Sequence, residues 1–351
     1  MTDEQFKKLL AQYHQGTLDE NEETEMEEFM KRYDVYNEFL EESDQEEAIE
    51  APTVVQTEKI LKRAQKSLFF RNAIIAVSII LIILPLLTML SVVYYGVGGE
   101  NGRGNDIIKT VTIMSEITQP NVQVNSNTIE HEIFPFNLNI SVHKYSTSNS
   151  EKQYLGEDRY QFFFDKLYNQ QSDYRDTSYS ADTLKHYFVH PKSSYSMKNE
   201  AKKIEQLPKG LPIEVNVSLN RDYSSEEINQ LFNSYSISWY AVDTGIESKL
   251  KTDWDLNQTP VMGIPTQGKT VKLTKKQYKD FISDLTFLNE REKLASSLTP
   301  YKDLKLQTRI KELKKRKDFN IYGFTMTTTP DQIAALKAKK EVKQITLLDE
   351  K

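Results

Sequence analysis

The stretch RNAIIAVSIILIILPLLTMLSVVYYG, residues Arg71–Gly96, decides the architecture of this chain. No charged residue occurs between Arg71 and Glu100, although the chain as a whole is polar. A helix rises about 1.5 Å per residue, so residues 73–95 make a rod of roughly 34 Å, long enough to cross a hydrocarbon core of about 30 Å. The pattern therefore predicts a membrane-spanning helix at residues 73–95. Pro85 lies inside it and predicts a local kink, which membrane helices tolerate.

The charges on the two sides of this segment predict its orientation. Residues 51–72 hold five Lys or Arg residues and one acidic residue, whereas the charges that closely follow the span cancel. Because an excess of Lys and Arg marks the cytoplasmic side, we expect residues 1–72 to be cytoplasmic and residues 96–351 to be extracytoplasmic. A cleaved secretory signal would begin within the first few residues, so we expect this span to be retained as a single-pass anchor in the cell membrane.

The net charge also differs strongly between the segments of the chain. Residues 1–50 contain 17 acidic and 4 basic residues, a net of −13, and residues 51–72 carry +4. Since the whole chain carries −6, the rest carries +3. The acidic segment argues against direct binding of nucleic acid and favours a basic protein surface as its partner. The chain has no cysteine, which excludes disulfides, thiolate metal sites and a cysteine nucleophile.

Apolar residues recur in the acidic segment at the spacing of amphipathic helices. We expect three short helices: one that Gly16 ends, a second that Thr17 caps, and a third that starts at Asp34. Their apolar faces are Phe6, Leu9, Leu10 and Tyr13, then Leu18, Met26, Phe29, Met30 and Tyr33, and finally Tyr36, Phe39 and Leu40. So short a segment buries little surface, and two interpretations stay open. The helices form a weak bundle whose apolar faces pack only on one another, or they finish folding on a partner.

Several segments resemble a known family. Membrane-bound bacterial anti-sigma factors of the sigma-factor-regulator type have an N-terminal part that is similar to FKKLLAQYHQGTLDENEETEMEEFMKRYDVYNEFLEE, followed by TEKILKRAQKSLFFRN before the span. Their C-terminal domain is similar to LPIEVNVSLNRDYSSEEINQLFNSYSISWYAVDTG and FNIYGFTMTTTPDQIAALKAKKEVKQITLLD. Residues 107–195 are the least diagnostic. The order of these segments on one chain carries the resemblance.

The resemblance implies that the cytoplasmic helices wrap an extracytoplasmic-function sigma factor and hide its surfaces for core RNA polymerase and promoter DNA. Many heads of such proteins bind zinc through His-x3-Cys-x2-Cys, and this chain departs from that pattern because His14 has no Cys partner. We therefore expect no metal and no cofactor. The implied contact residues, some of which must form the core of the head itself, are Phe6, Leu9, Leu10, Tyr13, Met26, Phe29, Met30 and Tyr33.

The segment that follows the span predicts a joint and a β-rich region. Residues 96–105, GVGGENGRGN, hold five glycines, which is typical of a flexible linker. The stretches KTVTIM, NVQV and FNLNISV favour strands. In contrast, EDRYQFFFDKLYNQQ, residues 157–171, fits a helix, and we expect Phe162, Phe163 and Phe164 in a core.

The last 150 or so residues predict an α+β domain. Two β-α-β units are expected: strand 213–219, helix 223–232 and strand 237–242, then strand 320–327, helix 329–339 and strand 342–347. Residues 275–296 supply one or two further helices. Trp239, Tyr240 and Trp254 are expected in the core rather than on a binding surface.

Catalysis has no support in the sequence. His186 and His190 have the spacing of two ligands on a helix, but Pro191 follows at once and no His-Glu-x-x-His pattern accompanies them. Neither a Gly-x-Ser-x-Gly elbow nor a Ser-x-x-Lys set with its companion motifs occurs. We therefore expect no metal site and no enzyme.

These observations predict a multidomain protein: a small all-α cytoplasmic head, one transmembrane helix and an α+β extracytoplasmic domain. The expected segments are the head at 1–50, a basic juxtamembrane helix at 51–72, the transmembrane helix at 73–95, a Gly-rich linker at 96–106, a β-rich region at 107–195 and an α+β domain at 196–351.

The expected function is that of an anti-sigma factor. It would hold an extracytoplasmic-function sigma factor at the membrane and release it when the exterior domain meets an envelope signal or a second membrane protein. The alternative is a single-pass membrane adaptor or sensor with another cytoplasmic partner. An exterior cell-wall enzyme with a mere anchor is a further rival, which the missing catalytic motifs disfavour.

Overall fold

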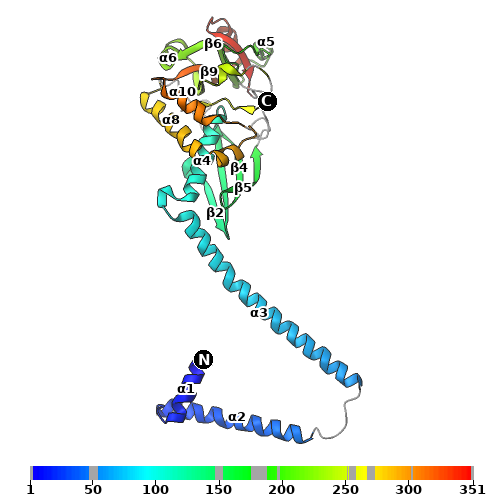
Figure 1. Cartoon of the computed structure of the whole chain (residues 1–351). Coiled ribbons are helices and arrows are strands. Elements are labelled where there is room, and N and C mark those ends of the chain that lie inside the picture. Colours follow the sequence, from blue (N-terminus) through cyan, green and yellow to red (C-terminus); the bar gives the residue numbers. More distant parts are fainter. Residues whose placement is uncertain are drawn as a thin grey trace. The chain divides into compact units, whose positions relative to one another are not determined.

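A computed structural model of the protein (Figure 1) describes residues 3–46, 54–146, 153–174, 188–195, 198–250, 252, 258–266, 273–301 and 303–348. The chain divides into two compact units, Met1–Ile80 and Leu81–Lys351. The described residues form helices and two antiparallel sheets, both of which lie in the second unit.

The head contains two helices rather than the expected three. Helix α1 spans Asp3–Gln15, and α2 runs without a break over Glu20–Glu46. The separate helix expected to start at Asp34 is therefore wrong. Residues 20–46 contain neither Gly nor Pro, the strongest helix breakers, so nothing in the sequence stops the helix at Asp34.

Helix α3, Val54–Gly96, joins the expected basic and apolar helices into one element with Pro85 inside it. Among the described residues, one helical segment, Leu61–Gly96, is long and apolar enough to cross a membrane. Its most apolar window is not buried by the rest of the protein. Such side chains are suited to lipid rather than to water.

The glycine-rich segment after α3 forms a tight turn rather than the expected loose linker. A short 3₁₀ helix, η1 (Gly99–Asn101), follows α3, and α4 then begins at Arg103 and ends at Thr118. Gly98 and Gly99 have φ values of 107° and 56°, which side chains with a Cβ rarely adopt. The glycines therefore adopt the backbone conformations that this tight turn requires.

The strand expected at KTVTIM is also wrong, because this stretch lies in α4. Ile107, Val111 and Met114 recur at helical spacing and are buried. The hydroxyl of Thr110 donates to the carbonyl of Asp106, four residues earlier. Burial of one helical face thus overrides the β preference of the branched side chains.

The first sheet contains β1 (Gln123–Val124), β2 (Glu130–Phe134), β3 (Asn137–Ser146), β4 (Gln153–Phe163) and β5 (Lys166–Tyr174). The strand order is β1-β3-β4-β5, and β2 also pairs with β3. The expected helix at 157–171 is wrong, because these residues form the β4–β5 hairpin. Phe162 is buried as expected, whereas Phe163, on the opposite face of β4, is 48% exposed.

The second sheet confirms both expected β-α-β units. The first consists of β6 (Ile213–Ser224), α6 (Ser225–Phe232) and β7 (Ser236–Val242). The second consists of β9 (Asn320–Thr328), α11 (Pro330–Lys337) and β10 (Val342–Leu347).

In the order β10-β6-β9-β7-β8, with β8 at Gly263–Pro265, each unit has one strand of the other inserted between its own two strands. This is the split, ferredoxin-like arrangement.

Further helices complete the second unit. They are α5 (Ala201–Ile204), η5 (Glu247–Lys249), α8 (Lys275–Glu290), α9 (Glu292–Ser297) and α10 (Leu306–Lys314), with η2 (Ser126–Thr128) between β1 and β2. Helices α8 and α10 pack side by side (Figure 1).

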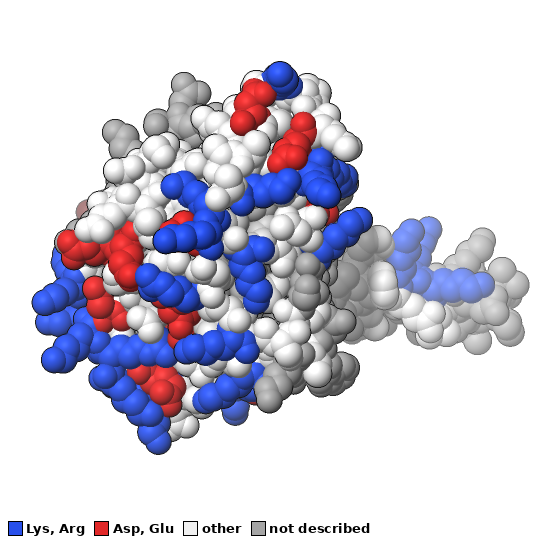
Figure 2. Space-filling view, turned by 90° about the horizontal axis from the view of Figure 1, so that it is seen from above, with Lys and Arg blue, Asp and Glu red and all other residues white. Residues whose placement is uncertain are grey.

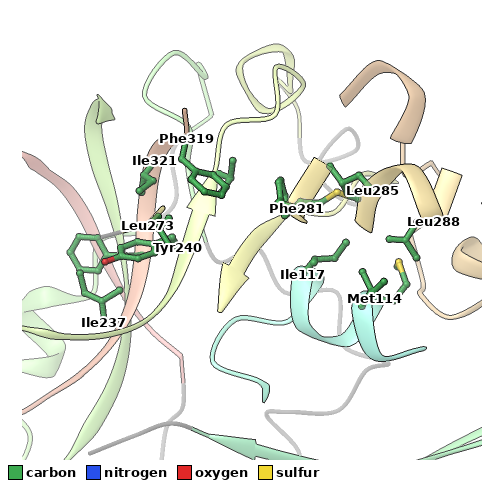
Figure 3. Packing of buried hydrophobic residues seen from close by; sticks show 14 of the residues in the cluster. Met114, Ile117, Ile237, Tyr240, Leu273, Phe281, Leu285, Leu288, Phe319 and Ile321 are labelled. Atoms are coloured by element: carbon green, nitrogen blue, oxygen red, sulfur yellow. The ribbon is translucent and has the colours of Figure 1, made fainter. Parts of the chain in front are cut away.

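One hydrophobic core joins α4 to both sheets. Met114 and Ile117 of α4 lie near Phe281, Leu285 and Leu288 of α8 (Figure 3). The core thereby links the segment that follows the span to the C-terminal sheet.

The two aromatic residues expected in the core of the second sheet lie there. Trp239 and Tyr240 are almost completely buried, and the indole N–H of Trp239 donates to the carbonyl of Glu116, 2.9 Å away. Their expected place in the core is confirmed, whereas Trp254 lies outside the described residues.

Candidate functional site

The turn between α1 and α2 sets the geometry of the head. Gly16 has φ 65°, its N–H donates to the carbonyl of Tyr13, and the N–H of Thr17 donates to the carbonyl of Gln12. These bonds, 3.1 and 3.0 Å long, form a Schellman motif that closes α1 with Gly16 in the left-handed conformation.

The cap of α2 is Asp19 rather than the expected Thr17. The Oδ1 atom of Asp19 accepts hydrogen bonds from the backbone N–H groups of Asn21 and Glu22, at 3.0 and 2.9 Å. Thr17 cannot start α2 because its backbone belongs to the turn that ends α1. A side-chain oxygen in this position satisfies the free N–H groups of the first turn.

The helical pair has a small core, and the eight predicted contact residues differ in how far they are buried in it. Met26 is 5% exposed, and the rings of Phe6 and Phe29 meet edge to face with centroids 5.0 Å apart. The partly buried members of the set are Phe6, Leu9, Leu10, Tyr13 and Met30. Phe29 and Tyr33 remain exposed by 46% and 50%. The first six are thus at least partly buried in the helical pair, whereas Phe29, although it contacts Phe6, and Tyr33 keep about half of their surface exposed.

The exposed residues belong to a longer row on α2, which we call the aromatic stripe: Phe29, Tyr33, Tyr36 and Leu40. Since each residue turns a helix by about 100°, positions 29, 33, 36 and 40 fall within roughly 60° of one another. Tyr36 is 56% exposed and Leu40 is 41% exposed. A row of large apolar side chains on an acidic helix is a surface suited to a protein partner.

Sequence reasoning missed Tyr36 and Leu40 as members of this site. It placed both in a separate helix after Asp34, which removed them from the face of Phe29 and Tyr33. The signal was present, because the spacing of four, three and four residues continues past Asp34 without a change of phase. Whether the eight predicted residues touch a partner stays a prediction.

A second polar cluster lies in the C-terminal sheet. His190 Nε2 lies 3.2 Å from Asp222 Oδ1 and 3.9 Å from Asp243 Oδ1, and the His190 side chain is buried. These three residues offer ligand atoms within 4.8 Å of one another, a spacing that a metal ion can occupy. Residue 186, the other half of the histidine pair in the sequence, lies outside the described residues.

The hydrogen bonds and charges of this cluster fit an ion pair better than a metal. The backbone N–H of Lys192 donates to His190 Nδ1, so the ring proton of a neutral imidazole lies on Nε2, where a metal would need a lone pair. Lys192 Nζ lies 3.5 Å from Asp222, and Arg316 lies 3.0 Å from Asp243. Cations therefore already balance both carboxylates. The absence of a metal from the chain stays a prediction.

The two carboxyl groups of the cluster have opposite pKa shifts. Burial opposes ionisation of Asp222, but His190 and Lys192 outweigh burial and hold the pKa of Asp222 below its usual value. Burial, with the nearby charge of Glu247, raises the pKa of Asp243. Charged contacts in the cluster thus connect the segment of His190 and Lys192 to Asp222 of β6 and to Asp243, which follows β7.

In the view of Figure 2 the face of the second unit carries both signs of charge, and Lys and Arg cover more of it than Asp and Glu. Lys and Arg are interspersed with Asp and Glu over the described part of this face. Such mixing is typical of a solvated surface rather than of a nucleic-acid interface.

Comparison with known protein families finds two domain models that match this chain. The model of the sigma factor regulator N-terminal domain matches residues 58–153, and that of the sigma factor regulator C-terminal domain matches residues 204–349. The chain belongs to the sigma factor regulator family.

Among curated proteins, the chain is similar to the probable anti-sigma-M factor YhdL of Bacillus subtilis (strain 168). The two are 29% identical over 357 residues, which cover 98% of this chain and 97% of that protein. The alignment therefore includes most of the head, which precedes both matched domains. No solved structure matches the chain.

Proposed function

We infer that this protein is an anti-sigma factor, whose head binds a sigma factor and keeps it inactive. The match to both sigma factor regulator domains carries this inference. Full-length similarity to a probable anti-sigma-M factor supports it. The aromatic stripe gives the head an exposed apolar surface, and its net charge of −13 suits a basic protein.

The proposed partner is a sigma factor of the extracytoplasmic-function type. Its surfaces for RNA polymerase and DNA are expected to be basic, because DNA is a polyanion. An acidic helix that covers such a surface competes with nucleic acid directly. The head binds the sigma factor and not the nucleic acid.

The proposed topology places the head in the cytoplasm and the second unit, from the end of α3 onward, outside. Five Lys or Arg residues and one acidic residue in residues 51–72 support this orientation. The exterior domain then regulates the head rather than catalysing a reaction. Its input is an envelope signal or a second membrane protein, and its output is release or retention of the sigma factor.

The test is recovery of the partner with the intact protein. Tagged full-length protein is extracted from its own bacterium in mild detergent, and the proteins that remain bound are identified by mass spectrometry. We expect one small sigma factor. Recovery of a different cytoplasmic regulator would instead support the alternative, a single-pass membrane sensor with another cytoplasmic partner.

Two adjacent residues of α2 provide a matched pair of variants. Tyr36→Asp places a charge on the aromatic stripe, whereas Val35→Asp places the same charge about 100° away on the same helix. Both side chains are exposed, by 56% and 65%. We expect Tyr36→Asp to lose the sigma factor and Val35→Asp to retain it. Equal retention by both variants would show that the stripe is not the contact surface.

A further inference from the structure

Two β-hairpins of the first sheet end against the last turns of α3. The β2–β3 hairpin turns at Pro135–Phe136, and the β4–β5 hairpin turns at Phe164–Asp165. The hydroxyl of Tyr95 donates to the carbonyls of Phe136 and Phe164, at 2.9 and 3.0 Å. The N–H of Phe164 donates to the carbonyl of Phe136, 2.9 Å away. Both turns are thus bound to each other and to one tyrosine.

A second contact lies deeper along α3. The N–H of Phe136 donates to Ser91 Oγ at 2.6 Å, and Ser91 is completely buried by this contact. Ser91 precedes Tyr95 by one helical turn, about 6 Å along the axis. The hairpin tips therefore reach past the end of α3 to the level of residues inside the expected span.

The residues at the two tips are unusual for turns. Phe136 and Phe164 both have φ 55°, a conformation in which Gly or Asn is usual. Their rings stack with centroids 4.9 Å apart, and Phe164 also meets the ring of Tyr94 edge to face at 5.1 Å. Strained backbone that carries large apolar side chains indicates a constraint other than the turn itself.

Exposed apolar side chains lie beside both tips, together with charged ones at the β4–β5 tip. Phe134 and Phe163 are 46% and 48% exposed, and Asp165 and Lys166 are exposed as well. On α3, Leu90 and Val93 are exposed by 48% and 49%. Turns in water are normally formed by Gly, Asn, Asp and Ser. Arg103 lies 4.5 Å from the ring of Tyr94, which places a cation at the upper edge of this apolar group.

We propose that the two hairpin tips insert into the outer interface of the lipid bilayer, beside the end of α3. The occupant of their exposed surface is lipid, because the tips contact α3 at Ser91, Tyr94 and Tyr95 and therefore lie at the depth of the end of the apolar span. Aromatic side chains favour this interfacial layer. The inference rests on the membrane span of the proposed function and adds a second membrane contact to it.

Site-directed spin labelling tests the depth of the tips. The chain has no cysteine, so single cysteines can be introduced into the full-length protein without removing others. The variants are Phe134→Cys and Phe163→Cys, one on each hairpin. Gln153→Cys, an exposed residue at the other end of β4, is the matched control on the same strand. Ile82→Cys, 72% exposed in α3, reports the span itself.

Each labelled protein is reconstituted into vesicles of phosphatidylethanolamine and phosphatidylglycerol. The ratio of nitroxide collisions with oxygen, which enriches in lipid, to collisions with a water-soluble nickel chelate is then measured. We expect this ratio at residues 134 and 163 to exceed the ratio at residue 153 several-fold and to remain below that at residue 82.

Three results would overturn the inference, and they differ from one another. Water-like ratios at residues 134 and 163, with a lipid ratio at residue 82, would reject insertion and leave the span intact. A water-like ratio at residue 82 would reject the span, and insertion with it. Low access to both reagents together with dipolar broadening that disappears on dilution with unlabelled protein would show that a second copy covers the tips.

Discussion

Lys144 is a charged residue completely buried in the first sheet, where it forms an ion pair with Asp158. Its ammonium group also donates to Gln119 Oε1 at 2.7 Å, and the hydroxyl of Tyr174 donates to Asp158 Oδ1 at 2.8 Å. Burial opposes ionisation of Asp158, but the charge and hydrogen bond of Lys144 outweigh it and hold its pKa below the usual value. The pair is thus completed by neighbouring polar groups, as buried charges require.

Removing one partner of this pair should be costly. In Lys144→Met, Asp158 is left as a buried charge without its cation, and we expect the free energy of unfolding to fall by about 3–5 kcal/mol. Urea unfolding of the full-length protein in detergent, followed by tryptophan fluorescence, measures this. Lys144→Met combined with Asp158→Leu is the control, and it should recover most of the loss. A single variant as stable as the double variant would contradict this account.

The same pair predicts how stability depends on pH. Because the pKa of Asp158 is lowered on folding, its contribution is present above the unfolded value of about 3.9 and is lost as the pH falls through the lower folded value. We expect the melting temperature of the natural protein to fall between about pH 5 and pH 2. The double variant without the pair should show a smaller fall. Equal slopes would exclude Asp158 as a source of the acid sensitivity.

At this scale the sequence predicted burial best where a large side chain lies in the interior of a strand. Trp239, Tyr240 and Phe162 are buried as expected. Phe163 is not, because the helical frame expected for its segment gave no alternation of faces. The buried pair of Lys144 and Asp158 was not predicted, since residues 14 positions apart in sequence meet only when β3 and β4 are paired.

Among the elements, the connection between α1 and α2 depends on one glycine. Gly16→Ala retains the chain length but forces a Cβ into the left-handed conformation at φ 65°, and we expect the helical pair to lose about 1 kcal/mol. Hydrogen exchange read by mass spectrometry should show faster exchange of the α1 amides. Gly96→Ala is the matched control, because an added Cβ meets nothing within 4 Å there and φ is not positive. Unchanged exchange in Gly16→Ala would show that the Schellman turn does not limit α1.

Two of the mispredicted elements differ in how far local preference could have revealed them. The segment of α4 carries β-branched residues whose local preference opposes a helix, whereas the aromatic residues of the β4–β5 hairpin favour the strands that form. In α4, β-branched residues form a helix because the buried face of Ile107, Val111 and Met114 packs into the core. In the hairpin, Tyr160 and Phe162 occupy one face of β4 and pack into the same core. Tertiary burial decided the case of α4, where local preference could not reveal it, whereas the strand preference of the aromatic residues was a signal for the hairpin.

For the whole molecule, the uneven charge predicts an ionic-strength effect on partner binding. The head carries −13 and the proposed partner is basic, so long-range attraction should accelerate association. We expect the association rate constant to fall at least about tenfold between roughly 0.05 and 0.5 M salt, and the dissociation rate constant to change less. Biolayer interferometry with the full-length protein in detergent measures both rates.

The control for this effect is Glu22→Gln with Glu25→Gln, two exposed residues of α2. This variant should show a smaller salt dependence. An association rate that does not change with salt would contradict electrostatic steering and would leave the apolar stripe as the main source of recognition.

The class of architecture was accessible from the sequence because its signals are strong. An uncharged apolar run, an acidic segment and two β-α-β patterns each extend over many residues, so single errors do not remove them. The contact between the end of α3 and the first sheet was not accessible from the sequence. It depends on Ser91 and Tyr95, whose partners at residues 136 and 164 are identified only by the fold.

The short turn between α3 and α4 has a consequence for how the proposed exterior domain meets other molecules. The glycines that predicted a flexible linker instead form a short turn between the last turn of α3 and the core that α4 shares with both sheets. With α3 as the proposed span, so short a connection keeps the domain at the membrane surface and lets it move only with its anchor in the plane of the membrane. The search for the proposed regulator is then two-dimensional, and abundance per membrane area matters more than concentration in the surrounding solution.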